Sequence, residues 1–233
     1  MKVQWRSLAL LVTSSRAANG FRSTSHTVRP CSPACCYHRT ITTRVHAKST
    51  EKSPSFQLRN ATLLDLETIL EWEEKPHLQD PDTMGDEEYN DWNWPYELAR
   101  KDLPWRFQLI AECSQRAIGM IQIIDPALEE SHYWGVDCPP NLRALDIWIG
   151  EEEYLGQGYG TEMMKQALRD YCFFDPTVEA ALVDPMASNP KAHRFYQKFG
   201  FVPEGIRYFG PDKCLVHRLT REDYEKTLHR GDP

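Results

Sequence analysis

The first fifty residues contain no aspartate and no glutamate. The same stretch carries eight lysines and arginines and 14 serines and threonines. A basic, hydroxyl-rich and acid-free N-terminus is typical of mitochondrial and plastid transit peptides. We therefore expect residues 1–54 to be a disordered leader that directs the chain to an organellar matrix. The alternatives are a secretory signal and an extension without targeting function, which would leave the protein in the cytoplasm.

Long apolar runs are also missing. The segment Leu8–Val12 is far too short to cross a bilayer, and no other stretch is long and apolar enough, so no membrane span is predicted. Three of the seven cysteines lie in the leader, but no second ligand pair stands at a spacing known from metal sites. The sequence therefore predicts no bound metal, and the cysteines outside the leader are expected to be reduced.

Basic residues are scarce in the rest of the chain. Residues 51–233 hold 19 lysines and arginines against 34 aspartates and glutamates. Such an acidic body repels phosphate backbones and attracts cations, which excludes nucleic acid as an expected partner and favours a small cationic molecule. No oligomeric state follows from these counts.

Beyond the leader, the apolar pattern alternates between the periods of strands and helices. Residues 56–59 alternate as a strand does, and Thr62 suits the N-cap of the helix that follows. The further expected elements are a short helix around 86–102, strands 105–113, 117–124 and 143–150, helix 158–174, strand 178–183, helix 189–199, strands 201–208 and 213–219, and helix 221–228. This order predicts a single α/β domain over residues 55–229, with a mixed central sheet of about six or seven strands flanked by helices.

Three alternate glycines, Gly156, Gly158 and Gly160, stand where a strand gives way to a helix. Glycines allow a tight turn, whose N–H groups and the positive end of the helix favour an anion such as a pyrophosphate. The lysine of a P-loop is absent and the spacing differs from that of a Rossmann turn, so neither of those nucleotide sites is indicated. A tight helix entry without any ligand would have the same pattern.

A second motif follows about thirty residues later, in which Asn189, Tyr196 and Gly200-Phe201 have the spacing Asn-x6-Tyr-x3-Gly-Phe. Together the two motifs resemble the GCN5-related N-acetyltransferase (GNAT) superfamily. Further motifs are Trp134, Arg143-Ala144-Leu145-Asp146, Leu155 to Thr161, Phe174-Asp175-Pro176, Asp184-Pro185 and Ser188-Asn189. They make the closer resemblance, over about residues 56–225, one to the aminoglycoside 6′-N-acetyltransferase branch, which is related to siderophore-type acyltransferases. Leu155 departs from the Arg or Gln of many superfamily members but agrees with this branch.

The resemblance implies acetyl-CoA as the donor of an acetyl group. Ile149 and Gly150 would lie beside the pantetheine arm, where a main-chain N–H would polarise the thioester carbonyl. Asn189 would bond the same arm, although an asparagine before a proline also suits a helix N-cap. The residues expected to hold the pyrophosphate are Leu155, Gly156, Gln157, Gly158, Tyr159, Gly160 and Thr161.

Asp146 is the expected base or anionic anchor for an acceptor amine. It interrupts an apolar strand, where a charge is costly unless it is used or paired, and alternation puts it on the face of Ala144 and Trp148. The resemblance implies the catalytic role, while pairing with Arg143 or solvation on an open face is the alternative.

Tyr196 is expected to protonate the departing thiolate, since a phenol is a suitable acid for that step. A core tyrosine on the apolar face of its helix is the alternative. Asp184 and Trp134 are expected to contact the acceptor, with Asp184 otherwise capping a turn. Further aromatic residues (Trp92, Trp94, Tyr133) and the acidic run 80–91 are weaker candidates for the same site, because loop aromatics often only pack and acidic runs are often solvated.

The function that these expectations describe is transfer of acetyl from acetyl-CoA to a primary amine of a small, aminoglycoside-like polycation, by direct attack in a ternary complex. One alternative is an acyltransferase for a hydroxylamine, as in siderophore assembly, or for a protein amine. The alternative of another class is a non-catalytic acyl-CoA-binding sensor.

Overall fold

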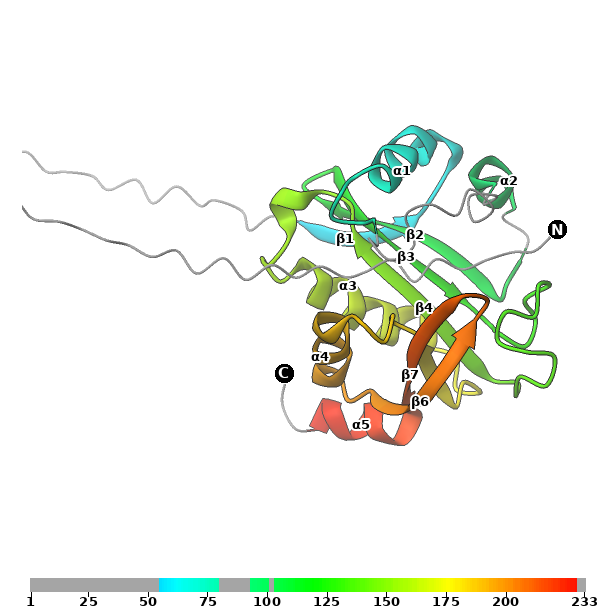
Figure 1. Cartoon of the computed structure of the whole chain (residues 1–233). Helices are drawn as coiled ribbons and strands as arrows, with labels where there is room; N and C mark the ends of the chain where they lie inside the picture. The colour runs from blue at the N-terminus through cyan, green and yellow to red at the C-terminus, as the bar shows by residue number, and fades with distance from the viewer. Residues whose placement is uncertain (1–54, 80–92, 101–102, 230–233) are drawn as a thin grey trace, which may run out of the picture. The chain divides into compact units, whose positions relative to one another are not determined.

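The computed structural model describes residues 55–79, 93–100 and 103–229. Seven strands form one sheet in the order β1-β2-β3-β4-β5-β7-β6. Figure 1 shows this sheet and labels its strands except β5. The strands are β1 (Phe56–Asn60), β2 (Arg106–Cys113), β3 (Arg116–Ile124), β4 (Leu142–Ile149), β5 (Ala180–Val183), β6 (Val202–Phe209) and β7 (Asp212–Thr220). All neighbours are antiparallel except β4 and β5. The expected α/β class with a mixed sheet of six or seven strands is confirmed. The leader expected over residues 1–54 lies outside the described residues.

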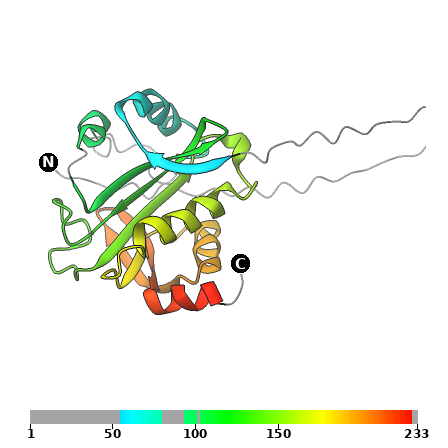
Figure 2. The ribbon, with the colours of Figure 1, turned by 180° about the vertical axis from the view of Figure 1, so that it is seen from behind.

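Helices cover both faces of this sheet. Figure 2, which shows the molecule from behind, shows α3 running along one face. The helices are α1 (Leu66–Glu73), α2 (Trp94–Ala99), α3 (Tyr159–Ala167), α4 (Pro190–Lys198) and α5 (Arg221–His229), with short 3-10 helices η1 (Leu63–Asp65) and η3 (Glu152–Tyr154) and the π-helical turn η4 (Leu168–Cys172). In the described residues, no helix combines the length and the apolar character that crossing a membrane requires.

Thr62 is the N-cap of η1, which leads into α1, as the sequence predicts. The Thr62 hydroxyl accepts the N–H of Leu64, and the carboxylate of Asp65 accepts the N–H of Thr62. Both carboxylate oxygens of Asp65 also accept hydrogen bonds from Arg59 at the end of β1. This capping box therefore joins the first strand to the first helix.

Two helices differ from the expected boundaries. In place of a helix around 86–102, α2 begins at Trp94, because Asn93 caps it by accepting the Tyr96 N–H and Pro95 occupies its first turn. Residues 80–92 and 101–102 lie outside the described part. The expected helix 158–174 is α helical only to Ala167, after which a wider turn forms and the Phe173 N–H reaches the Leu168 carbonyl.

The side chains of β4 alternate between the two faces. Leu145, Ile147 and Ile149 pack in one apolar cluster with residues of α3 and α4. On the other face, Ala144 packs in a cluster with Trp134, and Trp148 packs in a third cluster with α1 and α2. Asp146 therefore lies between two apolar clusters on the face that the sequence assigned to it.

The strands β4 and β5 separate soon after they meet. They pair only at Leu142 with Ala180, Arg143 with Ala181 and Ala144 with Leu182. Among the described strands, the remainder of β4 up to Ile149 pairs with β3 alone. One backbone edge of β4 therefore stays open, and this opening lies beside α3, which follows the glycine turn, and α4, which carries Tyr196.

Candidate active site

The glycine turn leads into α3 with left-handed backbone geometry. Gly156 and Gly158 have φ angles of 71° and 91°, and Gly158 is the N-cap, which leaves the helix without a side-chain cap. The Thr161 N–H bonds the Gly158 carbonyl at 2.9 Å. The preceding N–H groups of Tyr159 and Gly160 belong to the first turn, where an α-helix offers no acceptor. This end of α3 is therefore suited to an anion. The Leu155 N–H donates to the Glu152 carbonyl at 3.0 Å, so the backbone N–H groups expected to bind the pyrophosphate narrow to those of residues 156–160.

The larger side chains of the glycine turn make packing contacts and hydrogen bonds within the protein. Leu155 packs against the core cluster of α3 and α4. The ring of Tyr159 lies against Tyr154, with centroids 5.2 Å apart, and its hydroxyl is 3.2 Å from the Cys113 sulfur. Gln157 turns back to bond the Glu153 carbonyl. These contacts hold the turn in place while its backbone faces away from the core.

The open edge of β4 is partly occupied by the protein itself. The Ile147 N–H donates to Oδ1 of Asp146 at 2.9 Å. His77 Nε2 lies 3.0 Å from the Ile149 carbonyl oxygen and must carry the proton, because a carbonyl only accepts. The structure thus places Ile149 on the open edge, as expected for a residue beside pantetheine.

Gly150 is placed differently from Ile149. Its N–H donates to the Ile118 carbonyl of β3 at 2.9 Å and so faces away from the opening. A Cβ atom here would lie 2.1–2.5 Å from the Trp72 ring. Glycine is therefore required for close approach of Trp72, whose indole N–H donates to Glu151. That packing role had no signal in the sequence.

Asp146 does not pair with Arg143. The Arg143 guanidinium is 3.1 Å from the carboxylate of Asp125 and 3.3 Å from that of Asp175. Gln122 of β3 stands directly opposite Asp146 and is 5% exposed. Cross-strand partners share a face, so the side chains of Gln122 and Asp146 project from the same side of the sheet. Gln122 was missed, although one polar residue in an otherwise apolar strand could have indicated it.

Tyr196 is buried on α4, with 4% of its surface exposed. Burial raises its pKa well above 10, and the negative charges of Asp146 and Asp184 raise it further. The structure therefore brings the three residues close enough to interact electrostatically, although they belong to β4, α4 and the segment after β5. A tyrosine with a raised pKa keeps its proton at neutral pH and remains able to donate it.

Asn189 is the N-cap of α4, where its Oδ1 accepts the Ala192 N–H at 3.1 Å. The capping alternative from the sequence is thus confirmed. Its Nδ2 donates to none of the described residues, so the same side chain retains a donor beside the opening.

Asp184 is held by the loop that precedes β4. Its Oδ2 accepts a 2.7 Å hydrogen bond from the Tyr133 hydroxyl. The Tyr133 ring stacks on Phe209 with centroids 4.4 Å apart, and the Trp134 ring meets Phe209 edge-on at 5.1 Å. Trp134 is 4% exposed, so it supports this aromatic group from within the core. Sequence spacing could not have paired Tyr133 with Asp184, which is 51 positions away.

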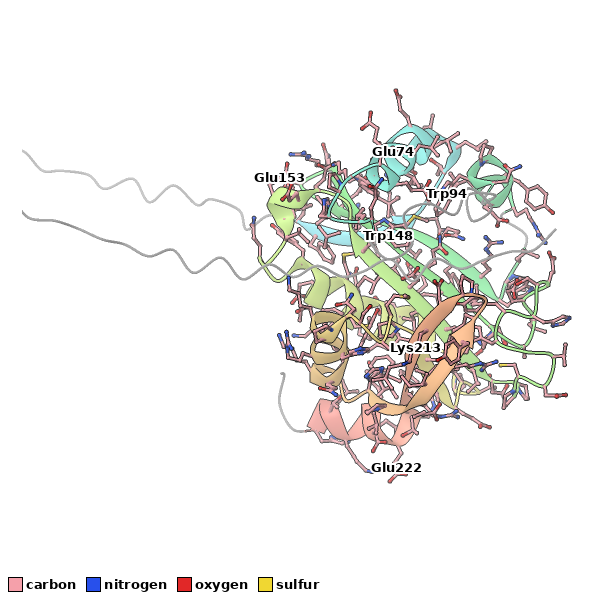
Figure 3. All side chains as sticks on the ribbon, viewed as in Figure 1. Glu74, Trp94, Trp148, Glu153, Lys213 and Glu222 are labelled. Atoms are coloured by element: carbon pink, nitrogen blue, oxygen red, sulfur yellow. The ribbon has the colours of Figure 1, made fainter. Side chains whose placement is uncertain are left out.

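The other expected aromatic and acidic candidates have different positions. Trp94 is buried against Trp148, with ring centroids 6.4 Å apart, and its indole N–H donates to Glu73. Figure 3 labels both tryptophans on their elements. Trp92 and the acidic run 80–91 lie outside the described residues. No group of three or more histidine, cysteine, aspartate or glutamate side chains in the described part could hold a metal.

A family model and individual relatives both identify this chain as similar to acetyltransferases. The model of the family described as acetyltransferase (GNAT) domain matches residues 62–209. Aminoglycoside N(6′)-acetyltransferase type 1 of Klebsiella pneumoniae is 29% identical over 188 residues, covering 76% of this chain and 89% of that protein. A kanamycin resistance protein of Rhizobium radiobacter is 35% identical over 101 residues, covering 43% of this chain and 92% of that protein.

Solved structures agree with this result. Aminoglycoside acetyltransferase AAC(6′)-Ib in complex with coenzyme A and kanamycin has a TM-score of 0.60 and 26% identity, covering 75% of this chain and 99% of that one. The matched model spans the open edge of β4, the glycine turn and α4. The chain belongs to the GNAT acetyltransferase family and is an acetyl-CoA-dependent N-acetyltransferase.

Proposed function

We propose that the acceptor is a primary amine of a small polycation similar to an aminoglycoside. The observation that supports this is the position of two carboxylates on the strands that separate, Asp146 on β4 and Asp184 directly after β5, whose charges both raise the pKa of Tyr196. Two carboxylates at one opening favour an acceptor with more than one ammonium group. The relatives are named for aminoglycoside acetylation and kanamycin resistance, which agrees with that class.

The proposed reaction is a direct attack in a ternary complex. Asp146 accepts a proton from the acceptor ammonium, and the neutral nitrogen attacks the thioester carbonyl carbon of acetyl-CoA. The C–N bond forms as the C–S bond breaks. Tyr196 donates its proton to the departing sulfur, which leaves CoA as a thiol, and the resulting phenolate takes up the second proton, which the new amide nitrogen loses. Asp146 then releases the first proton to solvent. The N–H groups at the start of α3 bind the pyrophosphate, and Asn189 Nδ2 donates to the pantetheine arm.

The experiment is measurement of thiol release from acetyl-CoA with a panel of amines. The panel contains kanamycin, ribostamycin, spermidine, a lysine-containing peptide and an alkyl hydroxylamine. We expect the aminoglycosides to give the highest kcat/KM. A higher kcat/KM for the peptide or the hydroxylamine would contradict the proposed acceptor and identify a protein amine or a hydroxylamine as the acceptor instead. CoA binding without thiol release for any amine would instead indicate the non-catalytic sensor.

Asp146→Asn separates an ordinary amine from a hydroxylamine. An alkylammonium is charged at neutral pH and needs a base, whereas a hydroxylamine nitrogen is mostly neutral. We expect Asp146→Asn to lower kcat/KM for the preferred amine by about 10²–10⁴. A change of less than about threefold would favour the hydroxylamine, because its nitrogen needs little help from a base.

The location of the protein in the cell is a separate proposal. We propose that residues 1–54 direct the chain to a mitochondrial or plastid matrix, because this segment is basic and its first fifty residues contain no acidic residue. Imaging a fusion of residues 1–52 to a fluorescent reporter tests it. An organellar signal is expected, and a diffuse cytosolic signal would contradict the proposal.

A further inference from the structure

A cavity of about 600 Å³ lies beneath the loop that precedes β4, beside the strands β5, β6 and β7. Its wall includes the indole of Trp134 and the apolar side chains Leu142, Leu182 and Val216. The volume falls within the range of small-molecule sites, which combine an apolar wall with a few polar groups. None of the carboxylates assigned to acetyl transfer lines it.

The polar groups of this cavity include two arginines. Arg207 donates a hydrogen bond to the Trp134 carbonyl, and its guanidinium lies 5.0 Å from the Phe209 ring centroid and 5.7 Å from that of Trp134. It has no carboxylate partner among the described residues. A guanidinium fixed by a carbonyl and two rings keeps its remaining N–H groups available in a set direction.

The positive charge of the second arginine, Arg218, is only weakly balanced by a neighbouring carboxylate. Arg218 reaches Glu204 at 3.8 Å, which is beyond hydrogen-bonding distance. Cys138 lies in the cavity wall, and although burial raises the pKa of its thiol, the positive charges of Arg207 and Arg218 act to lower it. Both guanidinium groups therefore act on the same region of the cavity.

We propose that this cavity is a second ligand site, which binds a small organic carboxylate with an apolar body. The carboxylate would accept hydrogen bonds from Arg207, with Arg218 nearby, and the apolar part would lie against Trp134, Leu182 and Val216. The charge of this ligand is opposite to that of the proposed acceptor. Asp137 and Glu204 also line the cavity. An ammonium compound with the same body is therefore the necessary comparison.

Cys138 provides a direct probe of occupancy, because it is partly exposed in the cavity while Cys113, Cys172 and Cys214 are buried. The experiment measures the rate of Cys138 alkylation by N-ethylmaleimide in the full chain, by mass spectrometry of its peptide. Phenylacetate is the probe and phenethylamine is the comparison. We expect phenylacetate to slow alkylation of Cys138 with a Kd on the order of 1 mM, as suits so small a ligand. Phenethylamine is expected to give no protection at the same concentration.

Arg207→Gln is expected to weaken phenylacetate protection by at least about tenfold, since hydrogen bonds to charged groups contribute more than neutral ones. Arg169→Gln, an exposed arginine on the π-helical turn, is the matched control and should retain protection. Equal protection by the amine, or unchanged protection in Arg207→Gln, would overturn the proposal. So would a lack of protection in the wild-type protein. A crystal structure with 4-bromophenylacetate gives an independent answer, since the bromine signal must lie in this cavity.

Discussion

The hydroxyl of Tyr133 donates a 2.7 Å hydrogen bond to Oδ2 of Asp184 and so joins the loop before β4 to the end of β5. Tyr133→Phe removes the donor while keeping the stack on Phe209. A hydrogen bond to a charged group is worth about 1.5–3 kcal/mol, so we expect KM for the amine acceptor to rise at least roughly tenfold. KM for acetyl-CoA should not change, because Asp184 is assigned to the acceptor.

Tyr208→Phe is the control for this variant, since Tyr208 is an exposed tyrosine of β6. Steady-state kinetics with each substrate varied in turn gives both KM values. If Tyr133→Phe and the wild-type enzyme had the same acceptor KM, the hydrogen bond would have no part in acceptor binding.

The raised pKa of Tyr196 leads to a prediction about the pH dependence of kcat. Because burial and the charges of Asp146 and Asp184 hold its pKa well above 10, the phenol remains protonated throughout the neutral and mildly alkaline range. We expect kcat to show no loss from Tyr196 ionisation below about pH 10, the ordinary pKa of tyrosine. Tyr196→Phe should lower kcat by about 10²–10⁴ with little change in the affinity for CoA.

The kcat profile and CoA titration of Tyr196→Phe are the measurements. An alkaline limb with a midpoint near pH 8 that disappears in Tyr196→Phe would show that the phenol ionises too easily for the assigned role. An unchanged kcat would leave Tyr196 as a core residue.

Local patterns predicted most of the elements. The alternation of Leu145, Ile147 and Ile149 placed Asp146 on the correct face, because strand geometry has a fixed period of two. Thr62 capped its helix as expected, since that bond forms between residues close in sequence. Such features depend only on near neighbours, which a single sequence displays in full.

Features that depend on distant segments were not predictable from spacing. The separation of β4 from β5 after Ala144 and Leu182 follows from the packing of whole strands. The contact of His77 with Ile149 joins positions 72 apart, and the pairing of Arg143 with Asp125 depends on the path of a loop. The sequence identified the chemical groups of the site, whereas the tertiary fold decides which of them meet.

The glycine turn predicts opposite effects for two substitutions. Gly158 has a φ of 91°, so Gly158→Ala should destabilise the fold by about 1–2 kcal/mol and shift the N–H groups at the start of α3. CoA affinity should fall roughly tenfold, since binding would then have to restore the turn. Gly160 lies inside α3, and a Cβ there would meet Phe195 at 3.7 Å, which is ordinary contact.

Gly160→Ala should therefore fold as well as the wild type or better by up to about 1 kcal/mol, because alanine favours a helix over glycine. Calorimetric titration with CoA and thermal unfolding give both quantities for the two variants. Equal CoA affinity in Gly158→Ala and the wild type would contradict a binding role for this turn.

His217 on β7 should make stability depend on pH. It has no exposed surface and stacks on His193 of α4, with ring centroids 5.1 Å apart. Its Nδ1 lies 2.8 Å from the Leu215 carbonyl oxygen, and its Nε2 has no hydrogen-bond partner among the described residues. Burial lowers the pKa of His217, and the neighbouring His193 lowers it further, against the opposing effect of the Leu215 carbonyl.

A histidine whose pKa is lower in the folded state than in the unfolded state takes up its proton more readily on unfolding. The free energy of unfolding should therefore fall as the pH drops below the unfolded value of about 6.5 and should be insensitive to this group above it. His217→Gln removes the ionisation and should flatten this dependence, whatever it does to stability at neutral pH. Thermal unfolding between about pH 5 and pH 8 measures the slope, with His229→Gln as an exposed histidine control. An identical slope in His217→Gln and the wild type would assign the acid sensitivity to other groups.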